Sequence, residues 1–301
     1  MTDRKERLDT LAVVLLVTCC ALWGINQVAA KVALAEVPPL LQAGARSSGA
    51  AVLLVLFARL RGLPIWGRDG TGPAGWLAGL LFAAEFACMF VGLQYTSASR
   101  MVVFLYMAPF VVALGMPLLS RTERLDRWQV LGLLAAFGGV VWAFFEGFAK
   151  PAAGPQQWLG DALGFAAAVL WGLTTLVLRG SRLATALPEK TLLYQLALSG
   201  AALLLGGWRV GEVWPASLST TVWWLLAFQT AVVTFGSYLV WFWLIRHYPA
   251  TRLSAFTLLT PVFGLLAGTV LLGEPVTARL LTALVAVSFG IAMVNRSPRR
   301  R

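Results

Sequence analysis

The sequence contains little charge, one histidine and few cysteines. Only 12% of its 301 residues are charged and 59% are hydrophobic, whereas a soluble domain ordinarily carries about 25% charged residues. The three cysteines, Cys19, Cys20 and Cys88, fall in apolar runs, where a thiol behaves as a small hydrophobe. These shortages argue against a disulfide framework and predict that the protein holds no metal and no cofactor. They indicate an integral membrane protein.

Several catalytic and nucleotide-binding motifs are also missing. The chain has no GxxxxGK[ST] loop, which disfavours an ATP-driven pump. It has no histidine cluster and no GxSG-type serine, so an intramembrane enzyme is disfavoured and we expect no enzymatic activity. The filter or ring of charge that a channel needs is not visible. The net charge of +11 is spread between apolar runs, so no nucleic acid partner is expected. A secondary transporter is the class that remains.

Long apolar runs are abundant instead. A helix needs about 20 residues to cross a bilayer, and ten runs approach this length. The first run lacks a small-residue cleavage site, so we interpret it as a retained helix rather than a signal peptide. The sequence therefore predicts an all-α polytopic membrane protein with ten transmembrane helices, over residues 11–30, 38–58, 73–93, 98–118, 128–146, 160–179, 190–208, 222–244, 253–272 and 278–294.

Lysine and arginine predict the orientation of these helices. When the loops are numbered alternately from a cytoplasmic N-terminus, 18 of the 24 basic residues fall on one side. Basic loops stay preferentially in the cytoplasm. This separation therefore predicts that both termini are cytoplasmic.

Features of the first half recur in the second. The first helix of each half carries a Trp-Gly pair, and the fourth carries a proline that is followed by a turn led by glutamate. The matching residues are Trp23 and Trp171, Gly24 and Gly172, Pro109 and Pro261, and Glu123 and Glu274. We therefore divide the chain into a first five-helix repeat, 1–150, and a second, 151–301, within one integrated membrane domain.

An odd number of helices in each repeat has a physical consequence. The second copy begins on the opposite side of the membrane from the first, so the two repeats are inverted. Inverted repeats are typical of transporters that work by alternating access, in which the substrate site lies near the midplane between the halves.

Because these features occur in this order and in both halves, the sequence resembles the EamA-type members of the drug/metabolite transporter superfamily. Within that superfamily it is most similar to the bacterial aromatic amino acid exporters. The resemblance covers almost the whole chain. It implies a central cavity lined by the first, third, fourth, sixth, eighth and ninth helices. It also implies export of small metabolites from the cytoplasm, across the inner membrane of a bacterium.

Polar and aromatic residues lie on single faces of the helices that would line such a cavity. Exposure of these faces to hydrocarbon would cost free energy, so we expect them to face protein or water. Together they predict a pocket that stacks a planar ring and hydrogen-bonds a polar head. The candidate substrate-binding residues are Trp23, Asn26, Gln27, Glu85, Met89, Tyr106, Trp171, Thr175, Thr234, Ser237, Tyr238 and Trp241, and the candidate kink or gating residues are Pro109 and Pro261.

These residues have structural alternatives. The tryptophans are also typical of an interfacial belt, and threonine and serine also hydrogen-bond between membrane helices. Glu85, near the centre of the third run, is interpreted as binding a substrate ammonium, as coupling protons, or as a structural ion pair or neutral buried acid. For Arg46, snorkelling or structural pairing is favoured over binding of a substrate carboxylate.

The aromatic content of the predicted pocket favours aromatic or other amino acids as substrates. Nucleosides, purines and cationic drugs are the alternatives. The expected partners are this small-molecule substrate and the lipid bilayer, with protons an open question and a monomer the expected state.

Overall fold

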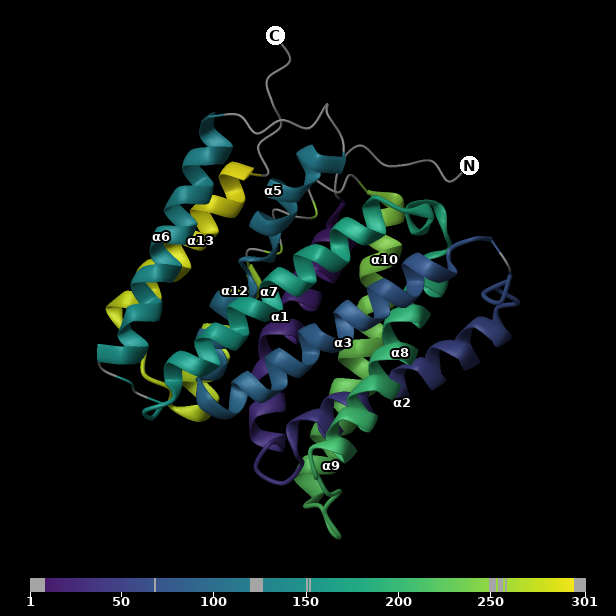
Figure 1. Ribbon diagram of the computed structural model, residues 1–301, viewed down its shortest axis with the longest axis horizontal. Helices are drawn as coiled ribbons and strands as arrows, with labels where there is room; N and C mark the ends of the chain where they lie inside the picture. Colours follow the sequence, from purple (N-terminus) through teal and green to yellow (C-terminus); the bar gives the residue numbers. More distant parts are fainter. Residues whose placement is uncertain are drawn as a thin grey trace.

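The fold is a bundle of long helices, described here by a computed structural model over residues 9–67, 69–119, 127–149, 151, 153–248, 253, 257 and 259–294. All regular secondary structure within these residues is helical (Figure 1). The elements are α1 (Thr10–Ala33), α2 (Pro39–Leu60), α3 (Gly72–Tyr95), α4 (Ala98–Leu105), α5 (Ala108–Leu119), α6 (Arg127–Ala149), α7 (Gln157–Arg179), η1 (Arg182–Thr185), α8 (Pro188–Arg209), α9 (Thr220–Ala227), η2 (Phe228–Ser237), α10 (Tyr238–His247), α12 (Leu259–Leu272) and α13 (Ala278–Val294).

Most of these helices match the length and composition of membrane spans. Within the described residues, eight helical segments are long and apolar enough to cross a bilayer, counting α4 with α5 and α9 with η2 and α10 as one segment each. Two further apolar helices, α12 and α13, are shorter. Each predicted run coincides with one of these elements, although the beginning of the ninth run lies largely outside the described residues. The chain is a multi-pass membrane protein.

The helices begin and end at residues suited to those positions. α2 and α8 both begin at a proline, Pro39 and Pro188, which lacks the N–H that would have no partner in the first turn. Both are followed by a glycine with positive φ, Gly62 at 63° and Gly211 at 82°, a conformation that stops a helix and favours glycine. These two helices therefore share the same start and stop signals.

Successive long helices run in alternating directions. We call the end of the bundle where α1 begins the near end, and the end where α1 finishes the far end. α6 and α13 lie side by side at one edge of the bundle, whereas α3 lies between α7 and α8 (Figure 1). α2 packs against α8, and α1 packs against α12. The interior is thus built from contacts between helices far apart in sequence.

Glycine allows the closest of these contacts. A β-carbon at Gly24 in α1 would lie 2.6 Å from the backbone nitrogen of Gly264, and one at Gly172 in α7 would lie 2.5 Å from Cβ of Val111. Only a glycine lets the backbones approach in this way. Gly138 in α6 differs, because a β-carbon there would meet no heavy atom within 4 Å.

Two spans are interrupted. The fourth breaks between α4 and α5, at Tyr106 and Met107, just before Pro109. A proline here cannot donate to the carbonyl four residues earlier, so the predicted kink at Pro109 is a true break. Pro261 lies at the third position of α12. The eighth span contains the ten-residue π-helix η2, which the sequence did not predict; π-helical turns are rare and frequently lie at functional sites.

Candidate functional site

Four of the candidate residues meet where α1 contacts η2 and α10. Nε1 of Trp23 donates a hydrogen bond of 2.8 Å to Oγ of Ser237. The Trp23 ring makes edge-on contacts with Tyr238 and Trp241, at centroid distances of 6.4 and 5.4 Å. The sequence placed these residues on two separate helices, and the structure brings them into one aromatic group around Trp23.

A second aromatic contact lies at the break in the fourth span. The ring of Tyr106 meets Trp171 of α7 edge-on, at 5.7 Å between centroids. Tyr106 is buried. The two tryptophans of the Trp-Gly pairs, Trp23 and Trp171, therefore each contact a tyrosine edge-on.

The remaining candidates are less closely grouped. Nε2 of Gln27 lies 3.5 Å from Sδ of Met89 in α3. The hydroxyls of Thr175 and Thr234 donate to carbonyls of their own helices, at 3.0 and 2.7 Å. Asn26 is buried, and its Oδ1 has no hydrogen-bond partner. The two threonine hydroxyls thus bond within their own helices rather than to the aromatic groups.

Two buried glutamines that were not among the candidates, Gln42 and Gln229, contact each other. Nε2 of Gln42 in α2 donates to the carbonyl of Ala30, at 3.2 Å, and to Oε1 of Gln229 in η2, at 3.3 Å. We define the central polar cluster as the five buried residues Gln27, Gln42, Arg46, Glu85 and Gln229.

Every member of the central polar cluster has a buried polar atom without a partner. These atoms are Oε1 of Gln27, Oε1 of Gln42, Nε and Nη2 of Arg46, Oε2 of Glu85 and Nε2 of Gln229. Buried polar atoms almost always have partners in folded proteins, and an atom without one costs about 1–3 kcal/mol. Such atoms mark positions where water or a ligand can supply the missing bonds.

Arg46 corrects a prediction. Its side chain is 1% exposed, so snorkelling to the membrane surface is wrong. Within the described residues no salt bridge joins it to Glu85 or to another carboxylate, so structural pairing stays a prediction. Its guanidinium lies instead over the rings of Phe86 and Phe90, 4.2 and 5.2 Å from their centroids. The physical reason is that α2 is covered by α3, α8 and η2.

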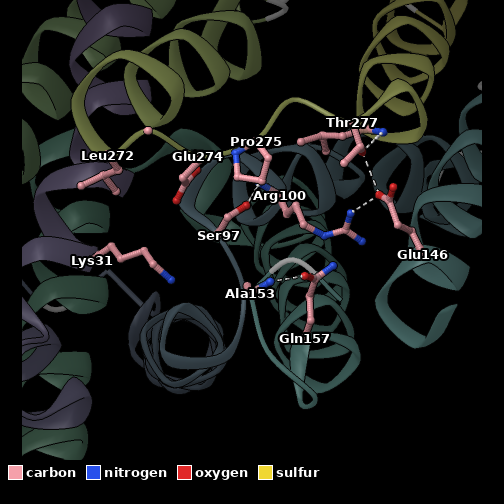
Figure 2. Close-up of a pocket in the computed structure, with 12 residues that line it drawn as sticks. Lys31, Ser97, Arg100, Glu146, Ala153, Gln157, Leu272, Glu274, Pro275 and Thr277 are labelled. Carbon is pink, nitrogen blue, oxygen red and sulfur yellow. Dashed lines mark hydrogen bonds and ion pairs between the residues drawn. The ribbon is translucent and has the colours of Figure 1, made fainter. Parts of the chain in front are cut away.

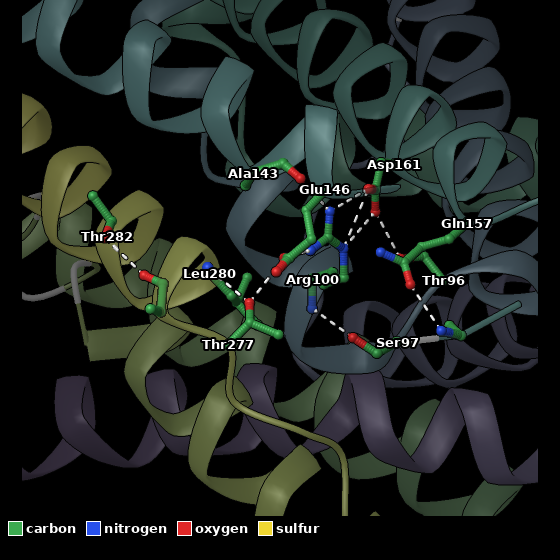
Figure 3. A network of polar contacts seen from close by, with 12 residues as sticks. Thr96, Ser97, Arg100, Ala143, Glu146, Gln157, Asp161, Thr277, Leu280 and Thr282 are labelled. Atoms are coloured by element: carbon green, nitrogen blue, oxygen red, sulfur yellow. Dashed lines mark hydrogen bonds and ion pairs between the residues drawn. The ribbon is translucent and has the colours of Figure 1, made fainter. Parts of the chain in front are cut away.

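A second set of polar residues ties the far end together (Figure 3). Nε and Nη2 of Arg100 in α4 donate to the carboxylate of Asp161 in α7, with an Nη2–Oδ2 distance of 2.5 Å. Nη1 of Arg100 donates to Oε2 of Glu146 in α6 at 2.8 Å. Thr96 and Thr277 donate to the two carboxylates, at 2.7 and 2.8 Å. We call these five residues the far-end network.

A pocket of about 330 Å³ lies beside this network (Figure 2). Lys31 reaches into it from α1, and its Nζ donates to the carbonyls of Leu93 and Thr96, where α3 ends. Glu274 accepts hydrogen bonds from the backbone nitrogens of Ala98 and Ser99, at 2.7 and 2.9 Å, where α4 begins. A cation thus stabilises a helix C-terminus and an anion a helix N-terminus, as the helix dipole favours.

The near end is held by different contacts. The Tyr248 hydroxyl donates to both carboxylate oxygens of Asp9, at 3.0 Å each. In the loop between α2 and α3, Asp69 forms an ion pair with Lys190 at 2.8 Å. The hydrogen bond from Lys190, together with one from Thr71, holds the pKa of Asp69 well below its ordinary value.

The far-end network was not predicted from the sequence, because its bonded residues lie up to 131 positions apart. One signal was visible. Arg100, Glu146 and Asp161 are charged residues within or beside apolar runs, and such residues normally find partners inside the bundle.

A comparison with known protein families decides the identity of the chain. The model of the EamA-like transporter family matches residues 10–145 and again residues 158–296. The chain belongs to this family. The predicted family is therefore confirmed.

This EamA-like transporter has full-length relatives. It is 29% identical over 300 residues to the uncharacterized transporter YvbV of Bacillus subtilis, covering 97% of this chain and 93% of the relative. It is 27% identical over 296 residues to a probable amino-acid metabolite efflux pump of Salmonella typhimurium, covering 96% and 94%. A solved crystal structure aligns over 94% of both chains with a TM-score of 0.66 at 21% identity, which supports the fold alone.

Proposed function

We propose that this chain is a secondary transporter that exports small metabolites, aromatic or other amino acids first, by alternating access through a central cavity. The observation that carries the proposal is the central polar cluster, whose buried polar atoms lack partners and which includes Gln27, one helical turn after Trp23 in α1. Such a place offers hydrogen bonds to a polar head and ring edges to an aromatic side chain. The efflux pump of Salmonella typhimurium is a relative whose name agrees with this substrate class.

The proposed architecture is ten transmembrane helices in two inverted repeats, 1–150 and 151–301. The separate matches of the family model to residues 10–145 and 158–296 support the duplication. The prolines that begin α2 and α8 are 149 positions apart, and so are the glycines that follow these helices.

The contacts at the two ends support the inversion. At the far end, Asp161 of the first helix in the second repeat accepts a hydrogen bond from Thr96, the C-cap of α3. At the near end, Asp9 before the first helix of the first repeat accepts from Tyr248, the C-cap of α10. The same contact between the repeats thus occurs once at each end, as a two-fold axis in the membrane plane requires.

In the proposed orientation the near end faces the cytoplasm of a bacterial cell, with both termini there and the chain in the inner membrane. The far-end network then closes the exit side. Release of substrate requires the bonds between Arg100 and its two carboxylates to break, so this network is the proposed outer gate. Alternating access follows if opening of this gate and closure at the near end are coupled.

The experiment is uptake of labelled tryptophan, phenylalanine and threonine into proteoliposomes that contain the purified protein, with and without a pH gradient. Saturable uptake of an aromatic amino acid above that of empty liposomes supports the proposal. A response to the gradient assigns proton coupling, with Glu85 as the candidate carrier, and no response favours a facilitator. Folded protein that transports none of the three overturns the amino acid assignment, and nucleosides, purines and cationic drugs are tested next.

A further inference from the structure

Arg46 is a cation placed deep in the membrane-spanning region, and among the residues that the structure describes no counter-ion contacts it. It is the eighth residue of α2, so it lies about 10 Å from the far end of that helix. Its side chain is 1% exposed, and Glu85 in α3 is 4% exposed. An unpaired charge in such a position is expensive, so a functional partner is the natural explanation.

The two unpartnered nitrogens of Arg46 form one edge of its guanidinium. The N–H groups of Nε and Nη2 point in the same direction and can donate to both oxygens of one carboxylate. The chain itself shows this arrangement elsewhere, because Nε and Nη2 of Arg100 donate to the carboxylate of Asp161. At Arg46 the same edge is buried and has no partner. The missing partner therefore has the shape of a carboxylate.

The neighbours of Arg46 hold the guanidinium without using this edge. Phe86 and Phe90 contact the face of the group, and cation–π contacts fix its plane while leaving its N–H groups free. Glu85 precedes Phe86 in α3, and its Oε2 also has no partner. No ion pair joins Arg46 and Glu85, and both side chains keep polar atoms without a partner that a ligand can bond.

We propose that Arg46 binds the carboxylate of the transported amino acid and that Glu85 receives its ammonium group. This assignment rests on the proposed function and narrows the substrate class to zwitterions that carry both groups. A zwitterion satisfies both charges, and the site keeps the same net charge when it loads and when it empties. Gln27 of the central polar cluster lies one helical turn after Trp23 in α1, and Trp23 contacts Tyr238. The side chain of the substrate therefore points toward the aromatic group around Trp23.

The first test uses the wild-type protein in proteoliposomes. Uptake of labelled tryptophan is measured against unlabelled tryptophan, tryptamine, which lacks the carboxylate, and indole-3-propionate, which lacks the ammonium group. We expect each analogue to compete at least about tenfold more weakly than tryptophan, because each loses a charged hydrogen bond. Tryptamine that competes as strongly as tryptophan overturns the role of Arg46, while aromatic amino acid transport stands. Indole-3-propionate that does so overturns the role of Glu85.

The second test uses the variant Arg46→Gln, with Arg59→Gln as the matched control, because Arg59 lies on the same helix and is exposed. We expect Arg46→Gln to lower tryptophan uptake at least about tenfold and Arg59→Gln to retain wild-type uptake. Folded Arg46→Gln protein with wild-type uptake overturns the proposal. If Arg46→Gln does not fold, the competition experiment decides alone. If folded wild-type protein takes up none of tryptophan, phenylalanine and threonine, the proposed function fails and this assignment fails with it.

Discussion

Replacement of Arg100 by methionine is the sharpest test of the far-end network. Arg100 is 4% exposed, and its guanidinium donates to Asp161, to Glu146 and to the carbonyl of Ala143. Methionine preserves much of the volume but removes the charge and all of these donors. Two buried carboxylates then lose the cation that contacts both of them.

The size of the effect follows from this geometry. Removal of one partner from a buried ion pair costs about 3–5 kcal/mol, because the remaining charge is buried without compensation. Here two carboxylates remain, and Asp161 is completely buried. We therefore expect Arg100→Met to lower the free energy of unfolding by at least about 3 kcal/mol. With about 2.1 cal/mol/K of unfolding entropy per residue, a chain of 301 residues would show a decrease in Tm of about 5 °C or more.

The assay is thermal unfolding of the detergent-solubilised protein, measured for a set of combined variants. If the loss comes from uncompensated carboxylates, the triple variant Arg100→Met/Asp161→Asn/Glu146→Gln regains most of the lost stability, because it removes both charges together with their partner. The variants must therefore be strongly non-additive. A triple variant whose loss equals the sum of the single losses would refute the reasoning, and so would Arg100→Met protein with wild-type stability.

Three further predictions follow from individual contacts. Gly24→Ala lowers stability by about 1–3 kcal/mol through overpacking. Gly138→Ala leaves Tm unchanged or raises it, because a β-carbon there meets no heavy atom within 4 Å. Equal losses in the two variants would contradict the packing account. Trp23→Phe keeps an aromatic ring at this position but loses the N–H that donates to Ser237. We therefore expect tryptophan uptake to fall while Tm stays close to wild type. Unchanged uptake would remove this donor from the mechanism. The pKa of Asp69 is lowered on folding, so its stabilising contribution is present at neutral pH and is lost as the pH falls below its ordinary pKa of about 3.9. Asp69→Asn is accordingly less stable than wild type at pH 7, and the difference shrinks in acid. Unfolding measured at several pH values would show this.

The helices could be predicted from the sequence because bilayer length and hydropathy determine them locally. The predicted run 73–93 lies within α3, and the run 160–179 lies within α7. The break in the fourth span was predictable from Pro109, since proline acts on its own helix. Each of these signals is read within about 20 residues of chain.

The charged contacts could not be predicted in this way. Whether Arg46 reaches the membrane surface depends on which helices cover α2, and that information lies in distant segments such as α8 and η2. For the aromatic group around Trp23, the sequence identified the residues as candidates but did not predict their contacts. The far-end network shows the same limit, since the partners of Arg100 lie 46 and 61 positions away.

The π-helix in the eighth span gives this helix a register that can change. Its hydrogen bonds span five residues rather than the four of an α-helix, so conversion of one turn to α-helix would rotate everything after it by about 100° and move it by about 1.5 Å along the axis. Ser237 is the last residue of this segment, and Tyr238 follows it. A one-residue rewinding would turn both away from Trp23 while every long helix stayed intact.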